Sequence, residues 1–114
     1  MLKLLLSVLL GTFMSCALAQ TLRIATFNVS MEAGNYAQAG SALSGNELFA
    51  QLATGKNQQI NNIAHIIQIV RPDIILLNEF DYTANDEKGI KAFLTHYLNV
   101  AQDQETAIDY PYFY

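Results

Sequence analysis

Two polar side chains, Asn28 and Glu79, stand at the ends of two short strand-like segments, and both types supply oxygen ligands to hard metal ions. Asn28 lies near the end of residues 22–29, where successive side chains alternate with the period of a strand. Glu79 ends residues 73–79, which contain a continuous apolar run typical of a strand covered on both faces. If the strands are parallel neighbours, both side chains emerge at one edge of the sheet, where open α/β sheets bind ligands. The pair therefore predicts half of an active site.

The segment between these strands predicts a helical crossover. Apolar residues recur at helical spacing over residues 57–70, and they cover so much of the surface that a helix buried between layers is expected. The apolar positions are Ile60, Ile63, Ala64, Ile66, Ile67, Ile69 and Val70. Pro72 disfavours helical geometry at Arg71 and ends the helix. Because a strand–helix–strand crossover within one sheet is almost always right-handed and parallel, we expect Asn28 and Glu79 to converge.

Weaker patterns surround this unit. Residues 30–57 form a long connection that contains four glycines, within which residues 47–53 can form two helical turns. Apolar spacing predicts a second helix over residues 89–101. Residues 108–114 are rich in aromatic side chains and are interpreted as the beginning of another strand. A chain that ends inside a strand would expose an unpaired edge, which favours a fragment of a larger domain.

The first nineteen residues have the pattern of a secretory signal peptide. Lys3 supplies a positive start, residues 4–14 are almost wholly apolar, and residues 17–19 (ALA) form a small-residue cleavage site. The apolar run is shorter than the about 20 residues that span a bilayer. We expect cleavage after Ala19, a secreted or periplasmic protein and no stable membrane anchor. The alternatives are a retained N-terminal anchor and lipid attachment at Cys16, whose preceding residues fit such processing poorly.

The cysteine count and the net charge exclude several classes of protein. Cys16 is the only cysteine and would leave with the signal, which excludes a disulfide scaffold and a thiolate metal site from residues 20–114. The chain has ten acidic and six basic side chains, and without Lys3 five basic ones remain, for a net charge of −5. This balance gives no basic footprint for nucleic acid and favours a divalent cation. Residues 20–114 are enough for one small domain.

The segments 26–29 (TFNV) and 71–79 (RPDIILLNE) resemble the opening of the endonuclease/exonuclease/phosphatase family of metal-dependent phosphoesterases. The resemblance implies the N-terminal part of a DNase I-like α/β sandwich, with a β-α-β unit, a following helix and the start of a third strand. It also implies that Glu79 binds the catalytic divalent cation and that Asn28 lies beside the metal and the scissile phosphate. Asn78 replaces the glutamine common before that glutamate, a change that affects hydrogen bonding around the ligand.

The two residue types suit Mg²⁺, with Mn²⁺ or Ca²⁺ as alternatives. Mg²⁺ takes oxygen ligands and usually binds through one or two carboxylates plus substrate phosphate. The resemblance implies a phosphoester substrate, whether nucleic acid, a phospholipid head group or a sugar phosphate, and a monomeric parent protein. We expect the 114 residues alone to be almost inactive, because the family's later motifs, which supply the base and further phosphate contacts, would lie beyond Tyr114.

Three further titratable residues have structural interpretations. His65 and His96 lie within the two predicted helices rather than near the strand ends, so neither is assigned a catalytic role. Asp81 follows Glu79 closely and could reach a metal, but an aspartate in a turn is more often bonded to the local backbone. The alternative to an enzyme fragment is a complete small secreted α/β module that binds a partner without catalysis.

Overall fold

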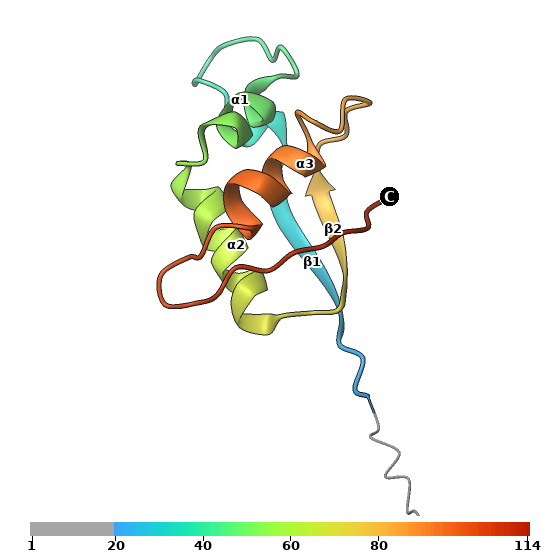
Figure 1. Cartoon of the computed structure of the whole chain (residues 1–114). Coiled ribbons are helices and arrows are strands. Elements are labelled where there is room, and N and C mark those ends of the chain that lie inside the picture. The colour runs from blue at the N-terminus through green and yellow to red at the C-terminus, as the bar shows by residue number, and fades with distance from the viewer. Residues whose placement is uncertain (1–19) are drawn as a thin grey trace, which may run out of the picture.

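A β-α-β unit organises the part of the chain that the computed structural model describes, residues 20–114. Strand β1 (Ile24–Met31) pairs in parallel with strand β2 (Ile74–Phe80), and helix α2 (Gln58–Val70) connects them (Figure 1). The predicted parallel pair is therefore confirmed, although β1 begins and ends two residues later than expected. The predicted signal peptide, residues 1–19, lies outside the described residues.

Helix α2 begins and ends for identifiable reasons. The side chain of Asn57 accepts a hydrogen bond from the backbone N–H of Ile60 at 3.2 Å, which caps the first turn. Arg71 leaves the helix in the left-handed conformation, with φ 49°, and Pro72 follows. The predicted helix end at Pro72 is confirmed, because the residue before a proline avoids helical geometry.

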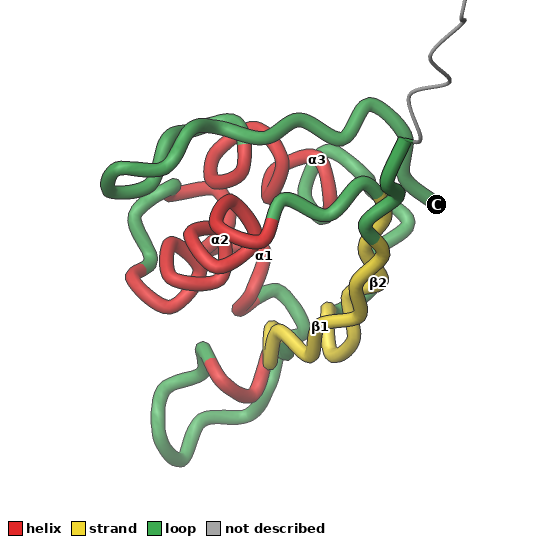
Figure 2. Tube along the Cα trace, turned by 90° about the horizontal axis from the view of Figure 1, so that it is seen from below, coloured by secondary structure: helices red, strands yellow, loops and turns green. Residues whose placement is uncertain are grey.

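The helices lie on one side of the two-stranded sheet (Figure 2). Helix α1 (Glu47–Thr54) confirms the helical turns expected in the long connection, which also contains a 3-10 helix, Ala33–Asn35. Helix α3 (Ile90–Phe93) continues into a π-helical turn, Leu94–Leu98. The phenyl ring of Phe93 lies 5.8 Å from that of Phe80 and 6.2 Å from the ring of Tyr97, measured between ring centroids. The buried core contains Val29, Met31, Leu48, Leu52, Ile60, Ile63, Ala64, Ile67, Phe93, Leu94, Tyr97 and Leu98.

The opposite face of the sheet is open to solvent. Large apolar side chains on this face keep more than half of their surface exposed: Ile24 67%, Ile74 53% and Leu76 62%. The expectation that β2 is covered on both faces is therefore wrong for residues 20–114. The prediction of a helix buried between two layers is also wrong, because α2 leaves Ile66, Ile69 and Val70 about half exposed.

The second predicted helix is shorter than residues 89–101. It ends at Leu98 because Gln68, buried in α2, donates to the carbonyl oxygens of Leu98 and Val100 at 3.0 and 2.8 Å. These bonds give the last carbonyl groups a partner outside the helix. The buried amide of Gln68 thus fixes the point where the chain leaves the π-helical turn.

The third strand expected over residues 108–114 is absent from the described part of the chain. This segment crosses the molecule without pairing to β1 or β2 (Figure 1). Its bonds run instead to the helical layer and the turn before β2: Ile108 N donates to Leu98 O at 2.9 Å, and the Tyr110 hydroxyl donates to Pro72 O at 2.8 Å. Isolated bonds of this kind hold the segment extended but form no ladder.

Within residues 20–114, no helix is both long enough and apolar enough to cross a membrane.

Candidate functional site

A β-bulge interrupts the ladder at the end where the site residues were expected. Asn28 stands opposite Asn78 and Met31 stands opposite Phe80, so Val29 and Ser30 together face the single residue Glu79. A bulge of this kind bends the strand and redirects side chains, and bulges are over-represented next to active sites. The irregularity therefore lies at the predicted residues and not elsewhere in the ladder.

Both sides of the bulge hold a residue with a positive φ angle. Ser30 has φ 49° and Glu79 has φ 55°. The left-handed conformation costs a residue with a side chain about 1–2 kcal/mol, and such strain is common at functional sites. Its effect on Glu79 is visible in the burial pattern of β2, because both Asn78 and Glu79 are exposed where strict alternation would turn Glu79 toward the helices. The strained backbone thus presents the carboxylate to solvent.

The Ser30 hydroxyl lies between the two predicted ligands. Asn28 Oδ1 accepts from the backbone N–H of Ser30 at 3.0 Å and from its hydroxyl at 3.4 Å. The same hydroxyl lies 3.5 Å from Glu79 Oε2. The structure therefore brings Asn28 and Glu79 to a common hydroxyl group, while their assignment as metal ligands stays a prediction.

Two carboxamides support the bulge from behind. The Ser30 carbonyl oxygen accepts from Asn35 Nδ2 at 2.7 Å and from Gln59 Nε2 at 3.3 Å. Asn35 belongs to the 3-10 helix after β1, and Gln59 to the first turn of α2. Elements on both sides of the long connection therefore hold Ser30 in its left-handed conformation.

Asp81 turns away from this group. Its Oδ2 accepts from the backbone N–H of Ala33 at 2.6 Å, and its own N–H donates to Met31 O at 3.0 Å. These bonds tie the chain after β2 to the start of the 3-10 helix after β1. They agree with the interpretation of Asp81 as a residue that caps a loop.

The two histidines lie elsewhere on the molecule. His65 Nδ1 pairs with Asp103 Oδ2 at 3.2 Å, on the outer side of α2. His96 is exposed on the π-helical turn. Neither contacts Asn28, Ser30 or Glu79.

Asn78 and Ser30 contribute contacts that the sequence argument missed. Asn78 Nδ2 donates to Thr26 Oγ1 at 2.8 Å, which joins the exposed faces of β1 and β2 one position before Glu79. Ser30 could have been found from its spacing to Asn28, because an asparagine oxygen often accepts from the N–H two residues on. Asn35 and Gln59 carry no comparable sequence signal, because only the folded chain brings them to Ser30.

The donor atoms at the bulge suit a hard cation. Glu79 offers a carboxylate, Asn28 an amide oxygen and Ser30 a hydroxyl oxygen, and both Asn28 and Glu79 are exposed. In the described part of the chain, no three His, Cys, Asp or Glu side chains gather as a ready metal cage. One carboxylate with neutral oxygens is the set that Mg²⁺ uses when water and substrate phosphate complete its coordination. The residues present therefore fit such an ion.

No protein-family model, curated protein or solved structure matches this chain.

Proposed function

We propose that this chain carries the metal- and phosphate-binding part of a divalent-metal-dependent phosphoesterase of the endonuclease/exonuclease/phosphatase class. The observation that supports it is the strained, solvent-facing Glu79 at a bulge that also holds Asn28 and Ser30. Glycine adopts φ 55° without strain, so a glutamate at this position favours a role for its side chain.

The proposal gives each residue a distinct task. Glu79 binds Mg²⁺, or Mn²⁺ or Ca²⁺, and Asn28 supplies a neutral oxygen or an N–H group beside the ion and the phosphoester. A divalent ion bound there would polarise the phosphoryl oxygens. Ser30 is a positioning residue, because its N–H orients the Asn28 amide and its hydroxyl lies between that amide and Glu79.

The open face of the sheet supports a larger architecture. In the proposal, β1 and β2 belong to a DNase I-like α/β sandwich whose second sheet covers that face, which carries Ile24, Ile74 and Leu76. An exposed apolar patch of this kind favours burial against another layer. The predicted signal peptide would direct the protein to a secreted or periplasmic location.

In the proposed reaction, the residues of this chain bind the metal ion and the phosphate. Within residues 20–114, no histidine and no second carboxylate contacts Glu79 or Asn28. Activation of the attacking water therefore falls to groups outside this set. The substrate is a phosphoester, and its phosphate is the part that the bulge would hold.

Metal binding tests the proposal without requiring turnover. We expect the chain to bind Mn²⁺ in an electron paramagnetic resonance titration, and we expect Mg²⁺ to displace it. Glu79→Gln should weaken Mn²⁺ binding by at least about 100-fold. The variant removes the charged metal ligand itself, and this loss should exceed the loss in affinity seen when a residue that only orients a metal ligand is replaced. Asp86→Asn removes the same charge from an exposed residue before α3 and serves as the matched control.

Equal Mn²⁺ affinity in the wild-type chain and Glu79→Gln would overturn the proposal. Circular dichroism and thermal unfolding of both variants show whether each keeps the wild-type fold. Loss of binding in Asp86→Asn as well would mean that Mn²⁺ responds to net charge, which also contradicts a site at Glu79.

A further inference from the structure

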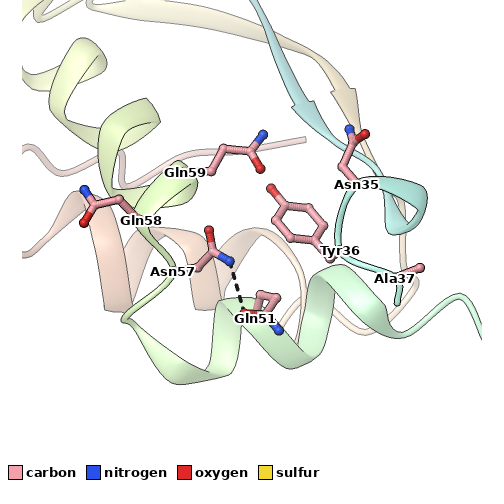
Figure 3. A pocket seen from close by; sticks show the side chains of 7 residues that line it. All are labelled: Asn35, Tyr36, Ala37, Gln51, Asn57, Gln58 and Gln59. Atoms are coloured by element: carbon pink, nitrogen blue, oxygen red, sulfur yellow. Dashed lines mark hydrogen bonds between the residues drawn. The ribbon is translucent and has the colours of Figure 1, made fainter. Parts of the chain in front are cut away.

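A polar cleft of about 410 Å³ adjoins the bulge. It lies between the chain after β1, the helix α1 and the first turn of α2 (Figure 3). Ala37 lines it together with one aromatic residue and five carboxamide residues: Tyr36, Asn35, Gln51, Asn57, Gln58 and Gln59. No acidic, basic or histidine side chain lines this cleft. Its wall is therefore uncharged and rich in hydrogen-bonding groups.

The cleft and the proposed metal site share a wall. Asn35 and Gln59 line the cleft, and their amide nitrogens hold the carbonyl oxygen of Ser30 at 2.7 and 3.3 Å. The hydroxyl of that same serine lies 3.5 Å from Glu79 Oε2. Ser30 thus connects the wall of the cleft to Glu79.

The carboxamides keep part of their bonding capacity. Gln51 Oε1 accepts from Asn57 Nδ2 at 3.1 Å, and Gln58 Nε2 donates to Asn62 Oδ1 at 2.9 Å. The side-chain amino group of Gln51 and the side-chain oxygens of Asn35, Gln58 and Gln59 remain available to another partner. The cleft therefore offers both donors and acceptors, which is what a hydroxyl group needs because it both donates and accepts.

Tyr36 adds one aromatic ring to this wall. Its ring stands between α1 and the start of α2, with its hydroxyl toward Gln59 (Figure 3). That hydroxyl is buried without a hydrogen-bond partner, and burial raises its pKa to about 12. The group stays neutral at physiological pH, so the cleft acquires no charge from it.

We propose that this cleft binds an uncharged polyhydroxylated group, a sugar ring or cyclic polyol, whose phosphate would lie at Asn28 and Glu79. The absence of charged lining residues argues against a second phosphate, and the five carboxamides argue against a lipid chain. A nucleobase is recognised mainly by stacking on flat surfaces, for which a single aromatic ring is a poor match. The identity as a phosphoester substrate rests on the proposed function, whereas occupancy of the cleft does not.

The test is an NMR titration of the isotopically labelled chain with myo-inositol, D-glucose, adenine and inorganic phosphate in turn, without metal. Myo-inositol or D-glucose should shift the side-chain amide signals of the cleft carboxamides, and adenine and inorganic phosphate should not. Ala37→Phe fills the cleft and should weaken polyol binding by at least about tenfold, which corresponds to the loss of about 1.4 kcal/mol of binding free energy. Ala39→Phe, at an exposed position of the same loop outside the cleft, is the matched control.

Gln58→Leu provides a second variant in case Ala37→Phe fails to fold. Gln58 is exposed on the first turn of α2, so its replacement removes a cleft carboxamide with little effect on packing. Polyol binding that weakens in Gln58→Leu and persists in Ala39→Phe supports the proposal. Stronger shifts with adenine, or none with either polyol, would overturn it.

The two proposals can fail separately. Polyol binding without Mn²⁺ binding would overturn the phosphoesterase function and leave the cleft as the site of a non-catalytic carbohydrate-binding module. Mn²⁺ binding without polyol binding would overturn only the assignment of the cleft. Glu79→Gln should keep wild-type polyol affinity, because Glu79 does not line the cleft.

Discussion

The polar residues at the two ends of the β1–β2 ladder differ in their hydrogen bonding. At the starting end, Arg23 N donates to Asp73 Oδ2 at 2.7 Å, and Asp73 N donates back to Arg23 O at 2.7 Å. The Arg23 guanidinium donates further to Val70 O, so the end of α2 joins the same group. At the finishing end, the Glu79 carboxylate has only a hydroxyl of Ser30 at 3.5 Å.

The difference separates residues that stabilise the fold from residues available for binding. The Asp73 carboxylate is used by the backbone where the strand begins, which is how a polar group contributes to stability. The Glu79 backbone is strained, and its carboxylate is exposed and almost without partners, which leaves the carboxylate oxygens available to a ligand. Two acidic residues six positions apart on one strand segment therefore have different surroundings that their residue type does not reveal.

The largest expected change in stability comes from the starting end. Asp73→Ala should lower the free energy of unfolding by about 1.5 kcal/mol, because the Arg23 N–H loses a charged acceptor. Glu79→Ala should change it by less than about 0.5 kcal/mol, as expected of a surface position without close partners. Urea unfolding followed by circular dichroism measures both. A larger loss in Glu79→Ala than in Asp73→Ala would reverse the comparison.

A smaller loss is expected from Asn28, which bonds to the Ser30 backbone and which the proposal places beside the metal ion. Asn28→Ala should lower the free energy of unfolding by about 1 kcal/mol. Asn28 Oδ1 accepts from the Ser30 N–H, and loss of a comparable side-chain-to-backbone bond at a helix N-cap costs about this much. Asn28→Asp keeps that acceptor and should retain most of the stability. Urea unfolding distinguishes the two variants. Equal destabilisation by both would mean that the bulge does not depend on this hydrogen bond.

The smallest expected effect concerns pH and Tyr36, in the loop that supports the finishing end. Burial raises the pKa of Tyr36 to about 12, above the usual value of about 10 for the unfolded chain. The folded state thus binds this proton more tightly, so the contribution of Tyr36 to the free energy of unfolding should be constant below pH 10 and should be lost as pH rises from about 10 to 12. Tyr36→Phe should make the resulting fall in stability less steep, while Tyr110, whose pKa burial also raises, keeps part of it.

Urea midpoints between pH 9 and 11 measure that slope. Identical slopes in the wild-type chain and Tyr36→Phe would show that Tyr36 does not lose its proton differently in the folded and unfolded states. Tyr36→Phe should also keep or raise stability at neutral pH, because it removes a buried hydroxyl that has no hydrogen-bond partner.

The sequence could predict the parts of the fold that depend on local pattern. The apolar period of α2, the proline after it and the two strands required a parallel unit, and from this followed the proximity of Asn28 and Glu79. The sequence could not show that the face of the sheet with Ile24 and Ile74 is open, because an apolar strand has the same pattern whether one face or both are covered. It also could not show the bulge, since Ser30 and Glu79 adopt a conformation that their residue types rarely take.

The C-terminal part departed from expectation for a related reason. The π-helical turn ends where Gln68 meets the carbonyl oxygens of Leu98 and Val100, a contact between residues about thirty positions apart. The aromatic run after it has the composition of a strand, yet its bonds lead to Leu98 and Pro72 instead of a neighbouring strand. Long-range contacts decided both outcomes, and local propensity does not encode them.

The most direct test of the central claim is Glu79→Gly, measured for stability and Mn²⁺ binding on the same sample. Glycine adopts φ 55° without strain, so the variant should be more stable than the wild-type chain by about 0.5–1 kcal/mol and should lose Mn²⁺ binding. Asn78→Gly, at the neighbouring position without a positive φ, should instead be less stable. A Glu79→Gly variant that is destabilised as much as Asn78→Gly, or that binds Mn²⁺ like the wild-type chain, would contradict the view that this residue is held under strain for binding.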